Sequence, residues 1–272
     1  MEKLSRREFI GSSAACAAWV ALGRPSFRED AYAPFKMEIQ SYSLRAFASE
    51  DAMQKTASLG LKYWEAYQDH VPMSNDEAAL QPIRGKLKQN GITLWCWGVQ
   101  GFDGDAAKCR KYFEFAKAMG IKIISADPAP DSFDHLEKLV KEFNIAIAIH
   151  NHGPGARYDK LESVLNAVKN RDKRIGACVD TGHTLRSGED PVEWVKQLGE
   201  RVHDIHLKDV KNRTEWKVLG QGDLRVVPLF KELRRLKFRN VVNLEYEENA
   251  GSPMDDLKAC LQTAQQAIRE SA

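Results

Sequence analysis

The sequence predicts a single-domain α/β protein of the (β/α)8 barrel class, the TIM barrel. From Pro34 onward, short apolar runs alternate about eight times with segments of helical period, often with Gly or Asn between them. Residues 34–272 have the length of such a barrel, which typically takes about 250 residues. Four of the apolar runs end in His, Asp or Glu, and barrel active sites lie at strand ends of this kind.

The apolar runs are the expected strands and the segments between them the expected helices. Gly60 and Gly120 are expected to end two helices, because glycine adopts the left-handed conformation at little cost, and Pro191 is expected to begin another. A doubly wound open sheet is the alternative, but no G-x-G-x-x-G follows the first strand. The predicted strands cover residues 36–42, 62–67, 92–97, 121–126, 145–149, 175–179, 202–207 and 241–244. The predicted helices cover residues 50–59, 76–89, 105–119, 132–143, 158–169, 191–198, 227–236 and 252–267.

Residues 1–33 are expected to form an export signal and linker ahead of the barrel. Arg6 and Arg7 stand directly before a small, apolar run at 11–22, a pattern that resembles a twin-arginine signal. A frayed helix with a chance arginine pair is the alternative. The apolar run is shorter than the roughly 20 residues that span a bilayer, so we expect no stable membrane span in the mature form. We therefore expect the twin-arginine export machinery as a partner and a periplasmic or exported location.

The composition limits the other partners. Hydrophobic residues make up 43% and charged residues 29% of the chain, and the formal net charge is +2. A charge this small favours neither nucleic acid nor an anionic membrane as a partner. The five cysteines form no C-x-x-C pair and no zinc-finger spacing, which indicates buried free thiols. A small-molecule sugar or glycoside is the expected ligand, and nothing in the sequence specifies an oligomeric state.

Four strand ends carry side chains that suit one divalent metal ion. Because strand side chains alternate between two faces, the polar ends are expected on the inner face of the barrel. Each one alone has a structural alternative, a satisfied core histidine or a buried ion pair. Burying all of them without a partner costs several kcal/mol, and a shared cation offsets that cost. The expected metal ligands are His150, Asp180, His206 and Glu245.

Two strand residues are further candidates for substrate contact. Glu65 also ends an apolar run, where it either contacts a substrate or forms a structural ion pair. Trp95 and Trp97 are expected to share one face of their strand. Trp97 then either stacks on a sugar ring or packs in the core.

Four short segments carry a resemblance to a known family. They read DTGH at 180–183, HLKD at 206–209, LGQGD at 219–223 and NLE at 243–245. In this order and spacing they resemble the xylose isomerase-like TIM-barrel superfamily of sugar isomerases and epimerases, over essentially all of residues 34–272. The resemblance implies the same four metal ligands at the ends of strands five to eight. It also places His183 near the substrate or metal, and Lys208 and Arg213 near sugar hydroxyls or an anionic group.

The chain departs from the superfamily on strand five. Epimerases of the superfamily use a glutamate there and one on strand eight as an acid and base pair, whereas this chain has His150 and His152 around Asn151. His150 is the expected ligand and proton shuttle, with His152 near the substrate; the two roles are exchanged in the alternative. In the expected mechanism the metal polarises a sugar carbonyl, and Glu245 or a strand-five His removes the α-proton. Two imidazoles and two carboxylates suit Mn, Zn, Co or Ni better than Mg.

These features favour a sugar isomerase or epimerase that works through an enediolate. A metal-dependent lyase or hydratase on keto-sugars or 3-keto-glycosides is the second interpretation, favoured by the export signal and the missing glutamate. A non-catalytic periplasmic sugar-binding barrel is the third. A metal-dependent endonuclease is the fourth, and the near-neutral charge and the lack of a basic, aromatic-interleaved stripe count against it.

Overall fold

The computed structural model describes residues 29–272. The predicted arginine pair and the apolar run after it lie outside the described residues, so the export signal stays a prediction. The described chain begins with a short 3-10 helix, η1 (Glu29–Tyr32), and Tyr32 is already buried in the core. Within residues 29–272, none of the helices has both the length and the apolar character needed to cross a membrane.

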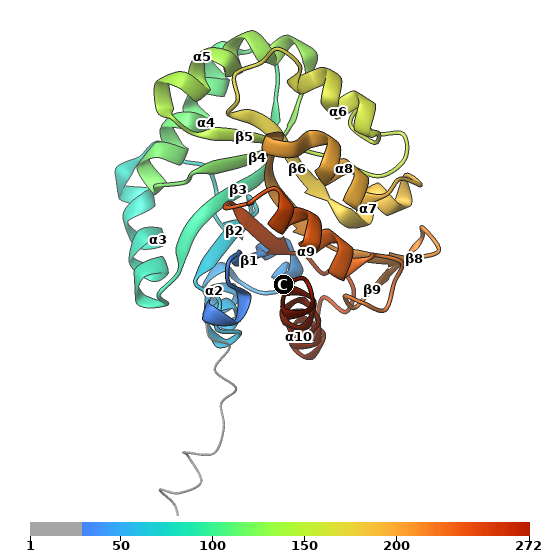
Figure 1. Cartoon of the computed structure of the whole chain (residues 1–272). Helices are drawn as coiled ribbons and strands as arrows, with labels where there is room; N and C mark the ends of the chain where they lie inside the picture. The colour runs from blue at the N-terminus through green and yellow to red at the C-terminus, as the bar shows by residue number, and fades with distance from the viewer. Residues whose placement is uncertain (1–28) are drawn as a thin grey trace, which may run out of the picture.

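Eight parallel strands close into one barrel, which confirms the predicted fold class (Figure 1). Around the barrel the strands follow the order β1, β10, β7, β6, β5, β4, β3, β2. Parallel neighbours bring all the C-terminal strand ends to one end of the barrel. The barrel strands are β1 (Lys36–Gln40), β2 (Tyr63–Ala66), β3 (Thr93–Phe102), β4 (Ile123–Pro128), β5 (Ala146–His150), β6 (Ile175–Asp180), β7 (Val202–Leu207) and β10 (Val241–Leu244).

Helices connect the strands on the outside of the barrel (Figure 1). They are α2 (Ser49–Ser58), α3 (Glu77–Gln89), α4 (Ala106–Met119), α5 (Phe133–Phe143), α6 (Leu161–Val168), α7 (Thr181–Arg186), α8 (Pro191–Leu198), α9 (Val226–Arg235) and α10 (Met254–Glu270). Asp76, Asp105 and Asp190 cap α3, α4 and α8 through their side chains, each contributing about 1 kcal/mol. Gly60 and Gly120 are left-handed after α2 and α4, as predicted.

Two elements near the strand ends were not predicted. The short helix α7 starts directly after β6, where the Asp180 carboxylate accepts the backbone N–H of His183 as an N-cap. A hairpin of β8 (Asp209–Lys211) and β9 (Glu215–Lys217) follows β7. Asn212 and Arg213 turn this hairpin with positive φ angles of 52° and 62°. Three-residue strands carry too short an apolar pattern to be recognised in a sequence.

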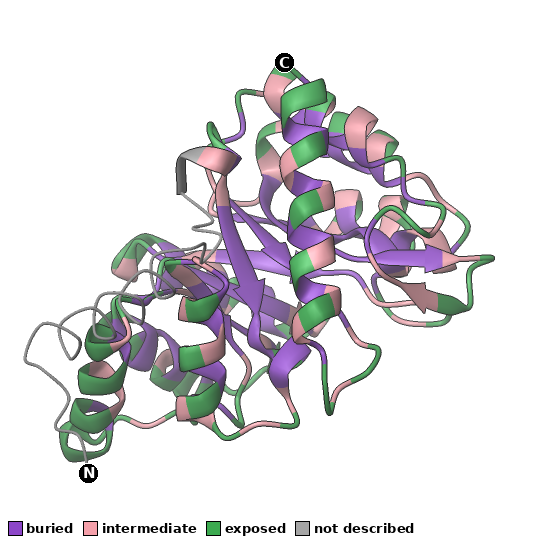
Figure 2. Cartoon of the chain, turned by 90° about the horizontal axis from the view of Figure 1, so that it is seen from below, coloured by how far each residue is buried: buried purple, intermediate pink, exposed green. Residues whose placement is uncertain are grey.

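Two layers of side chains fill the fold. Outward-facing strand residues such as Ile39, Trp64 and Ile205 are fully buried under the helices. Each large apolar side chain buried in this way contributes about 1.5–3 kcal/mol. Most residues of the barrel strands are buried, and the exposed residues lie mainly on the outer faces of the helices and in the loops (Figure 2). The barrel interior, in contrast, holds several fully buried polar side chains near the C-terminal strand ends: Glu38, Glu65, Ser125, Asp204 and Asn243.

A register shift between β2 and β3 corrects the prediction for Trp95 and Trp97. Trp64 pairs with Leu94 and Glu65 pairs with Cys96, so Trp95 is an extra residue in β3. Such a bulge breaks the alternation of faces. Trp95 therefore packs against a small apolar cluster in the barrel that includes Cys96, Ile123 and Cys178. Trp97 instead belongs to the core under the helices.

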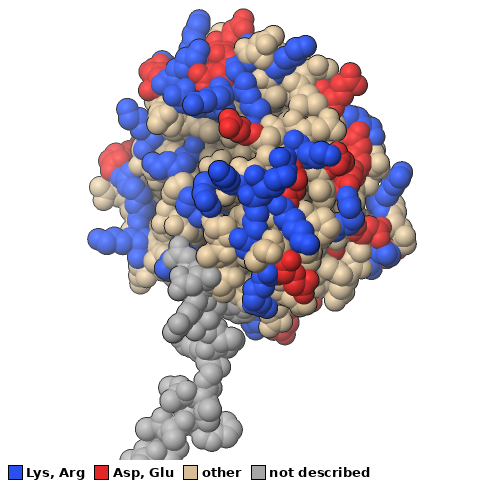
Figure 3. Space-filling view, in the orientation of Figure 1, with Lys and Arg blue, Asp and Glu red and all other residues tan. Residues whose placement is uncertain are grey.

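Basic and acidic side chains are mixed on the surface of the molecule. On the face shown in Figure 3, Lys and Arg gather near the middle, with acidic side chains among and around them. Several are exposed ion pairs, such as Arg110 with Glu142 and Arg235 with Glu232. Exposed pairs of this kind each contribute at most about 1 kcal/mol, so the buried layers determine the stability of the fold.

Candidate active site

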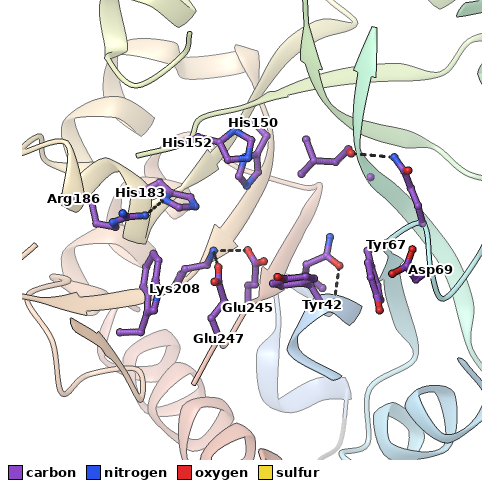
Figure 4. Close-up of a pocket in the computed structure, with 15 residues that line it drawn as sticks. Tyr42, Tyr67, Asp69, His150, His152, His183, Arg186, Lys208, Glu245 and Glu247 are labelled. Carbon is purple, nitrogen blue, oxygen red and sulfur yellow. Dashed lines mark hydrogen bonds and ion pairs between the residues drawn. The ribbon is translucent and has the colours of Figure 1, made fainter. Parts of the chain in front are cut away.

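A cavity of about 490 Å³ opens at the C-terminal ends of the barrel strands. Five of the residues predicted for the site line it: His150, His152, His183, Lys208 and Glu245 (Figure 4). Asp180 and His206 lie directly beneath them and are fully buried. The polar strand ends therefore meet in one place, as expected when parallel strands close into a barrel.

The four expected metal ligands lie within bonding reach of a common point. One donor atom from each of His150, Asp180, His206 and Glu245 lies within 4.8 Å of the other three. His150 Nε2 is 3.2 Å from His206 Nδ1 and 3.4 Å from Asp180 Oδ2. His206 Nδ1 is 3.0 Å from Glu245 Oε2. Two imidazole nitrogens and two carboxylate oxygens at this spacing form a donor set typical of a divalent transition metal.

The protonation of these groups fits a cation. Burial lowers the pKa of His150 to about 3, so its imidazole is neutral and keeps a lone pair near neutral pH. Burial alone raises the pKa of Asp180, but the charge of Lys208 and the nearby imidazoles hold it well below its usual range. Asp180 Oδ2 is buried, and its partners among the described residues are the Lys208 ammonium and the His150 imidazole. Cys178 also lies near His150 and His206, but burial raises its pKa well above the usual value, which disfavours a thiolate ligand.

Lys208 supplies a positive charge to the same carboxylates. Its Nζ lies 3.0 Å from Asp180 Oδ2, 2.9 Å from Glu245 Oε2 and 2.5 Å from Glu247 Oε1. Burial lowers the pKa of Lys208, but these three carboxylates more than reverse that effect and raise it overall. The ammonium group therefore stays charged, and it shares two oxygens with the metal-ligand set.

Glu65 supports the site from below and does not reach the cavity. It is fully buried, and its Oε2 lies 2.9 Å from His206 Nε2. Ser125 Oγ and Asn243 Nδ2 donate to the two oxygens of the same carboxylate. A carboxylate only accepts, so His206 Nε2 donates to Glu65, an arrangement common behind metal-binding histidines. Burial lowers the pKa of His206, but Cys178 and Glu65 raise it overall, so Nδ1, 3.0 Å from Glu245 Oε2, also carries a proton that a metal would displace. The structure thus places Glu65 in contact with His206 and outside the cavity lining, as the ion-pair interpretation expects.

Two further predicted residues are away from the cavity. Trp97 is completely buried; its Nε1 donates to Val71 O at 2.9 Å, and its ring packs against Phe115. Arg213 is exposed at the turn of the β8–β9 hairpin and lines a separate surface hollow beside Gly188. Neither residue lines the cavity, because a bulge turns Trp97 outward and an unpredicted hairpin carries Arg213 away.

The remaining imidazoles form one wall of the cavity. The rings of His150 and His152 are 4.6 Å apart, and those of His152 and His183 are 5.5 Å apart. Burial lowers the pKa of His183 to about 4. Its Nδ1 is 3.1 Å from the Arg186 guanidinium, which only donates, so the ring proton of His183 is on Nε2. Trp216 of the hairpin meets the His183 ring edge to face at 5.4 Å.

Several cavity residues had not been identified in the sequence. They come from the end of β1 and the 3-10 helix η2 (Ser41–Leu44) after it, from the loops after β2 and β10, from α7 and from the hairpin: Gln40, Tyr42, Tyr67, Asp69, Arg186, Trp216 and Glu247. Their positions just after strand ends were the available signal, because loops at that end of a barrel form its active site. The buried polar residues Glu38 and Asp204 share the inner face with Glu65 and His206, and the strand alternation could have indicated them.

Comparisons with known proteins agree with this architecture. Residues 53–270 match the family described as "Xylose isomerase-like TIM barrel". An inosose dehydratase of Clostridium botulinum is 28% identical over 137 residues, 42% of this chain and 44% of that protein. An inosose dehydratase of Bacillus cereus is 34% identical over 86 residues, 30% of this chain and 27% of that protein. The matched regions thus span less than half of these curated relatives.

Solved structures show the same barrel over most of the chain. An uncharacterized protein from Parabacteroides distasonis has a TM-score of 0.67 and 29% identity, covering 85% of this chain and 98% of that one. An IolI protein with a bound zinc atom has a TM-score of 0.73 and 16% identity, covering 88% and 99%. The family match extends over most of residues 29–272 and includes all four metal-ligand candidates. This chain therefore belongs to the xylose isomerase-like TIM barrel family.

Proposed function

We propose that the protein is a metal-dependent enzyme that removes the proton α to the carbonyl of a keto-sugar or keto-polyol, and that elimination of a β-substituent follows. The observation that carries the proposal is the neutral His150 at the end of β5, within a four-ligand set whose one cavity-facing carboxylate is Glu245. Epimerisation through paired glutamates requires an acid where this chain has His150. Elimination requires one base and a donor to the leaving group.

Glu245 is the group we assign as the base. Burial raises its pKa, but Lys208 and His206 hold it below the usual range, so it is a carboxylate at neutral pH. Its Oε2 contacts His206 and Lys208, while its Oε1 makes no hydrogen bond or ion pair with any other described residue. That free oxygen is available to accept the α-proton. A divalent ion held by His150, Asp180, His206 and Glu245 would act as a Lewis acid that makes this proton more acidic.

The wall of imidazoles supplies the other proton movements. His183 carries its proton on Nε2 and stays neutral, so it is suited to donate a hydrogen bond to the substrate oxygen. We assign His152, half-buried on the same wall, to the leaving group. The α-proton goes to Glu245, and the C–H electron pair forms the new C=C bond. The β C–O bond breaks, and its oxygen leaves as water or an alcohol with the proton from His152.

Charge in the cavity favours a substrate without phosphate. Lys208 is already paired with three carboxylates, so Arg186 is the one cavity-lining cation in residues 29–272 without a carboxylate partner. Phosphate sites usually combine several cations or backbone donors. An unphosphorylated sugar also fits the predicted exported location. The partial similarity to inosose dehydratases, which are named for a dehydration, supports elimination.

Isomerisation or epimerisation is the second candidate. It is favoured by the closeness of His152 and His183, which together with Glu245 provide more than one proton-transfer group around the cavity. The shared first step makes the two outcomes separable by their products alone.

The test is incubation of metal-loaded protein in D2O with 3-keto-glucose, a 3-keto-glucoside and a 2-keto-inositol, followed by NMR and mass spectrometry. Elimination is expected to give an unsaturated ketone that has lost water or an alcohol. A product that has lost neither water nor alcohol and carries deuterium at the α-carbon would establish isomerisation or epimerisation instead. Protein that holds about one metal per chain and exchanges no α-proton with any of the three would contradict the proposal.

A further inference from the structure

An exposed aromatic side chain stands at the mouth of the cavity. Two large apolar side chains are exposed in residues 29–272, Tyr42 at 38% and Met73 at 36%. Tyr42 lines the cavity, whereas Met73 does not. In Figure 4, Tyr42 and Tyr67 lie on the side of the cavity away from His183 and Arg186. Tyr42 therefore presents part of an aromatic ring to the cavity, where a sugar ring can stack on it.

Tyr42 is held in a fixed position by its neighbours. The Gln40 side chain accepts its backbone N–H at 3.0 Å. The Arg45 guanidinium covers its ring at 4.7 Å and is anchored to the backbone oxygen of Glu247. The rings of Tyr42 and Tyr67 pack edge to face, with their centroids 5.5 Å apart and an interplanar angle of 83°. Because these contacts already order the ring, a ligand that stacks on it loses little side-chain entropy on binding.

Tyr67 is tied to the same end of the barrel. Its backbone N–H donates to Ser41 Oγ at 2.9 Å, which joins the loops after β1 and β2. On its other side the ring meets His70 at 4.5 Å. Tyr42 and Tyr67 therefore form one preformed aromatic corner, built from residues adjacent to the first two strands and separate from the metal-ligand strands.

The groups beside this corner suit hydroxyls and not anions. Asp69 and Gln68 line the same side of the cavity. Asp69 forms no ion pair with a described residue, so its oxygens are free to accept from hydroxyl groups. Gln68 donates to Val99 O at 3.3 Å and to Gln100 Oε1 at 2.9 Å, which holds its amide in place. Among the described residues that line the cavity, the cations Lys208 and Arg186 lie at the imidazole end. Arg45 lies against the Tyr42 ring but is not part of the lining, and its guanidinium donates to the backbone oxygens of Tyr42 and Glu247.

We infer that Tyr42 and Tyr67, with Asp69 and Gln68, form a second sugar subsite, and that the substrate is an uncharged glycoside with two rings. This inference rests on the proposed function for the ring at the imidazole end. The outer ring stacks on Tyr42 and donates hydroxyls to Asp69. A cavity of about 490 Å³ lies within the roughly 300–1,000 Å³ range of pockets for drug-sized ligands, and a single six-carbon sugar is smaller than such ligands.

The experiment measures binding, which requires no turnover. Zinc-loaded protein is titrated with cellobiose, maltose, lactose and sucrose, and with glucose, galactose and fructose, by calorimetry and saturation-transfer NMR. At least one disaccharide is expected to bind more tightly than its component sugars, with saturation on both rings. Tyr42→Ala is expected to weaken that disaccharide about five- to tenfold and leave the single sugars unchanged.

Two matched variants separate stacking from other effects. Tyr42→Phe keeps the ring and is expected to bind the disaccharide within about twofold of the wild type. Met73→Ala removes the other exposed apolar side chain, away from the cavity, and is expected to change nothing. Equal losses for single and double sugars in Tyr42→Ala, no loss for either, or no disaccharide bound by the wild type would each overturn the inference.

The two proposals fail in different ways. If a disaccharide binds through Tyr42 while no keto-sugar exchanges its α-proton, the proposed chemistry fails and the subsite stands. If a keto-monosaccharide is converted by wild type and Tyr42→Ala with the same KM, and no disaccharide binds, the subsite fails and the chemistry stands.

Discussion

Nζ of Lys208 lies 3.0 Å from Oδ2 of Asp180, so an ammonium group contacts an oxygen that belongs to the metal-ligand set. Lys208 also contacts Glu245 in that set. The lysine and a divalent ion therefore neutralise the same two carboxylates. This arrangement keeps the buried acids paired when no metal is bound, and it opposes the metal when one binds.

Lys208→Met is therefore expected to have opposite effects on the metal-free and metal-bound protein. Without metal, removing one partner from buried carboxylates destabilises the fold by about 3–5 kcal/mol. With metal, the loss of a nearby positive charge tightens zinc binding by at least about tenfold. Urea unfolding with and without zinc, and calorimetric zinc titration, measure the two effects. Weaker zinc binding by the variant would show that Lys208 does not compete with the metal.

His150→Ala is expected to reduce the bound metal from about one per chain to near zero, because one of four donors is lost. His135→Ala is the matched control: His135 is a half-buried histidine that contacts the Gly104 backbone, away from the cavity. Metal content after dialysis, measured by mass spectrometry, reports the difference. Equal metal content in the two variants would mean that His150 is not a ligand.

Glu65→Gln tests the support beneath His206. The amide keeps the size of the side chain but loses the charge that polarises the imidazole, so metal affinity is expected to fall about 10- to 100-fold. KM at saturating metal is expected to stay constant, because Glu65 does not reach the cavity. A changed KM with unchanged metal affinity would instead support the substrate contact expected from the sequence.

The metal-free protein is expected to lose stability as the pH falls below about 6.5. The pKa of His150 is lowered to about 3 in the fold, so between these values the unfolded chain binds the proton that the folded chain excludes. At pH 4 this one group costs about 3 kcal/mol. The raised pKa of His206 acts the other way, adding stability that is lost as the pH rises above 6.5. Urea unfolding from pH 4 to 7 of wild type and His150→Gln isolates the first effect, and parallel curves for the two proteins would disprove it.

Trp97→Phe and Trp216→Phe distinguish a core tryptophan from a cavity tryptophan. Trp97→Phe leaves the Val71 carbonyl without its donor and opens space in the core, and is expected to cost about 1–3 kcal/mol with unchanged sugar affinity. Trp216→Phe is expected to alter sugar affinity with little loss of stability, since Trp216 is half-exposed in the hairpin. Thermal unfolding and sugar titration of both variants provide the comparison, and the opposite pattern would restore Trp97 as the stacking residue.

The barrel and the convergence of the strand ends could be predicted because both follow from periodic patterns. The alternation of faces placed His206 and Glu245 correctly on the inner side, since β7 and β10 pair in regular register from Asp204 to Leu207. The same alternation gave the wrong face for Trp97, because β3 contains a bulge. A bulge depends on how two strands pair, and the sequence of a single strand does not reveal it. Tyr42 and Trp216 lie in elements of three or four residues, too short to show a period, so only the folded chain brings them to the cavity.

The Asp209 carboxylate holds the loop that lies beside the Trp216 hairpin. Asp209 accepts the backbone N–H groups of Gly220, Gly222 and Leu224 at 2.8–3.0 Å, which fastens the loop at 219–224 to the base of the hairpin that carries Trp216. The hairpin pairs only with itself and not with the barrel sheet. Residues of the hairpin such as Trp216 can therefore be substituted while Asp209 is kept. Such substitutions change a side chain that lines the cavity and leave the barrel strands unaltered.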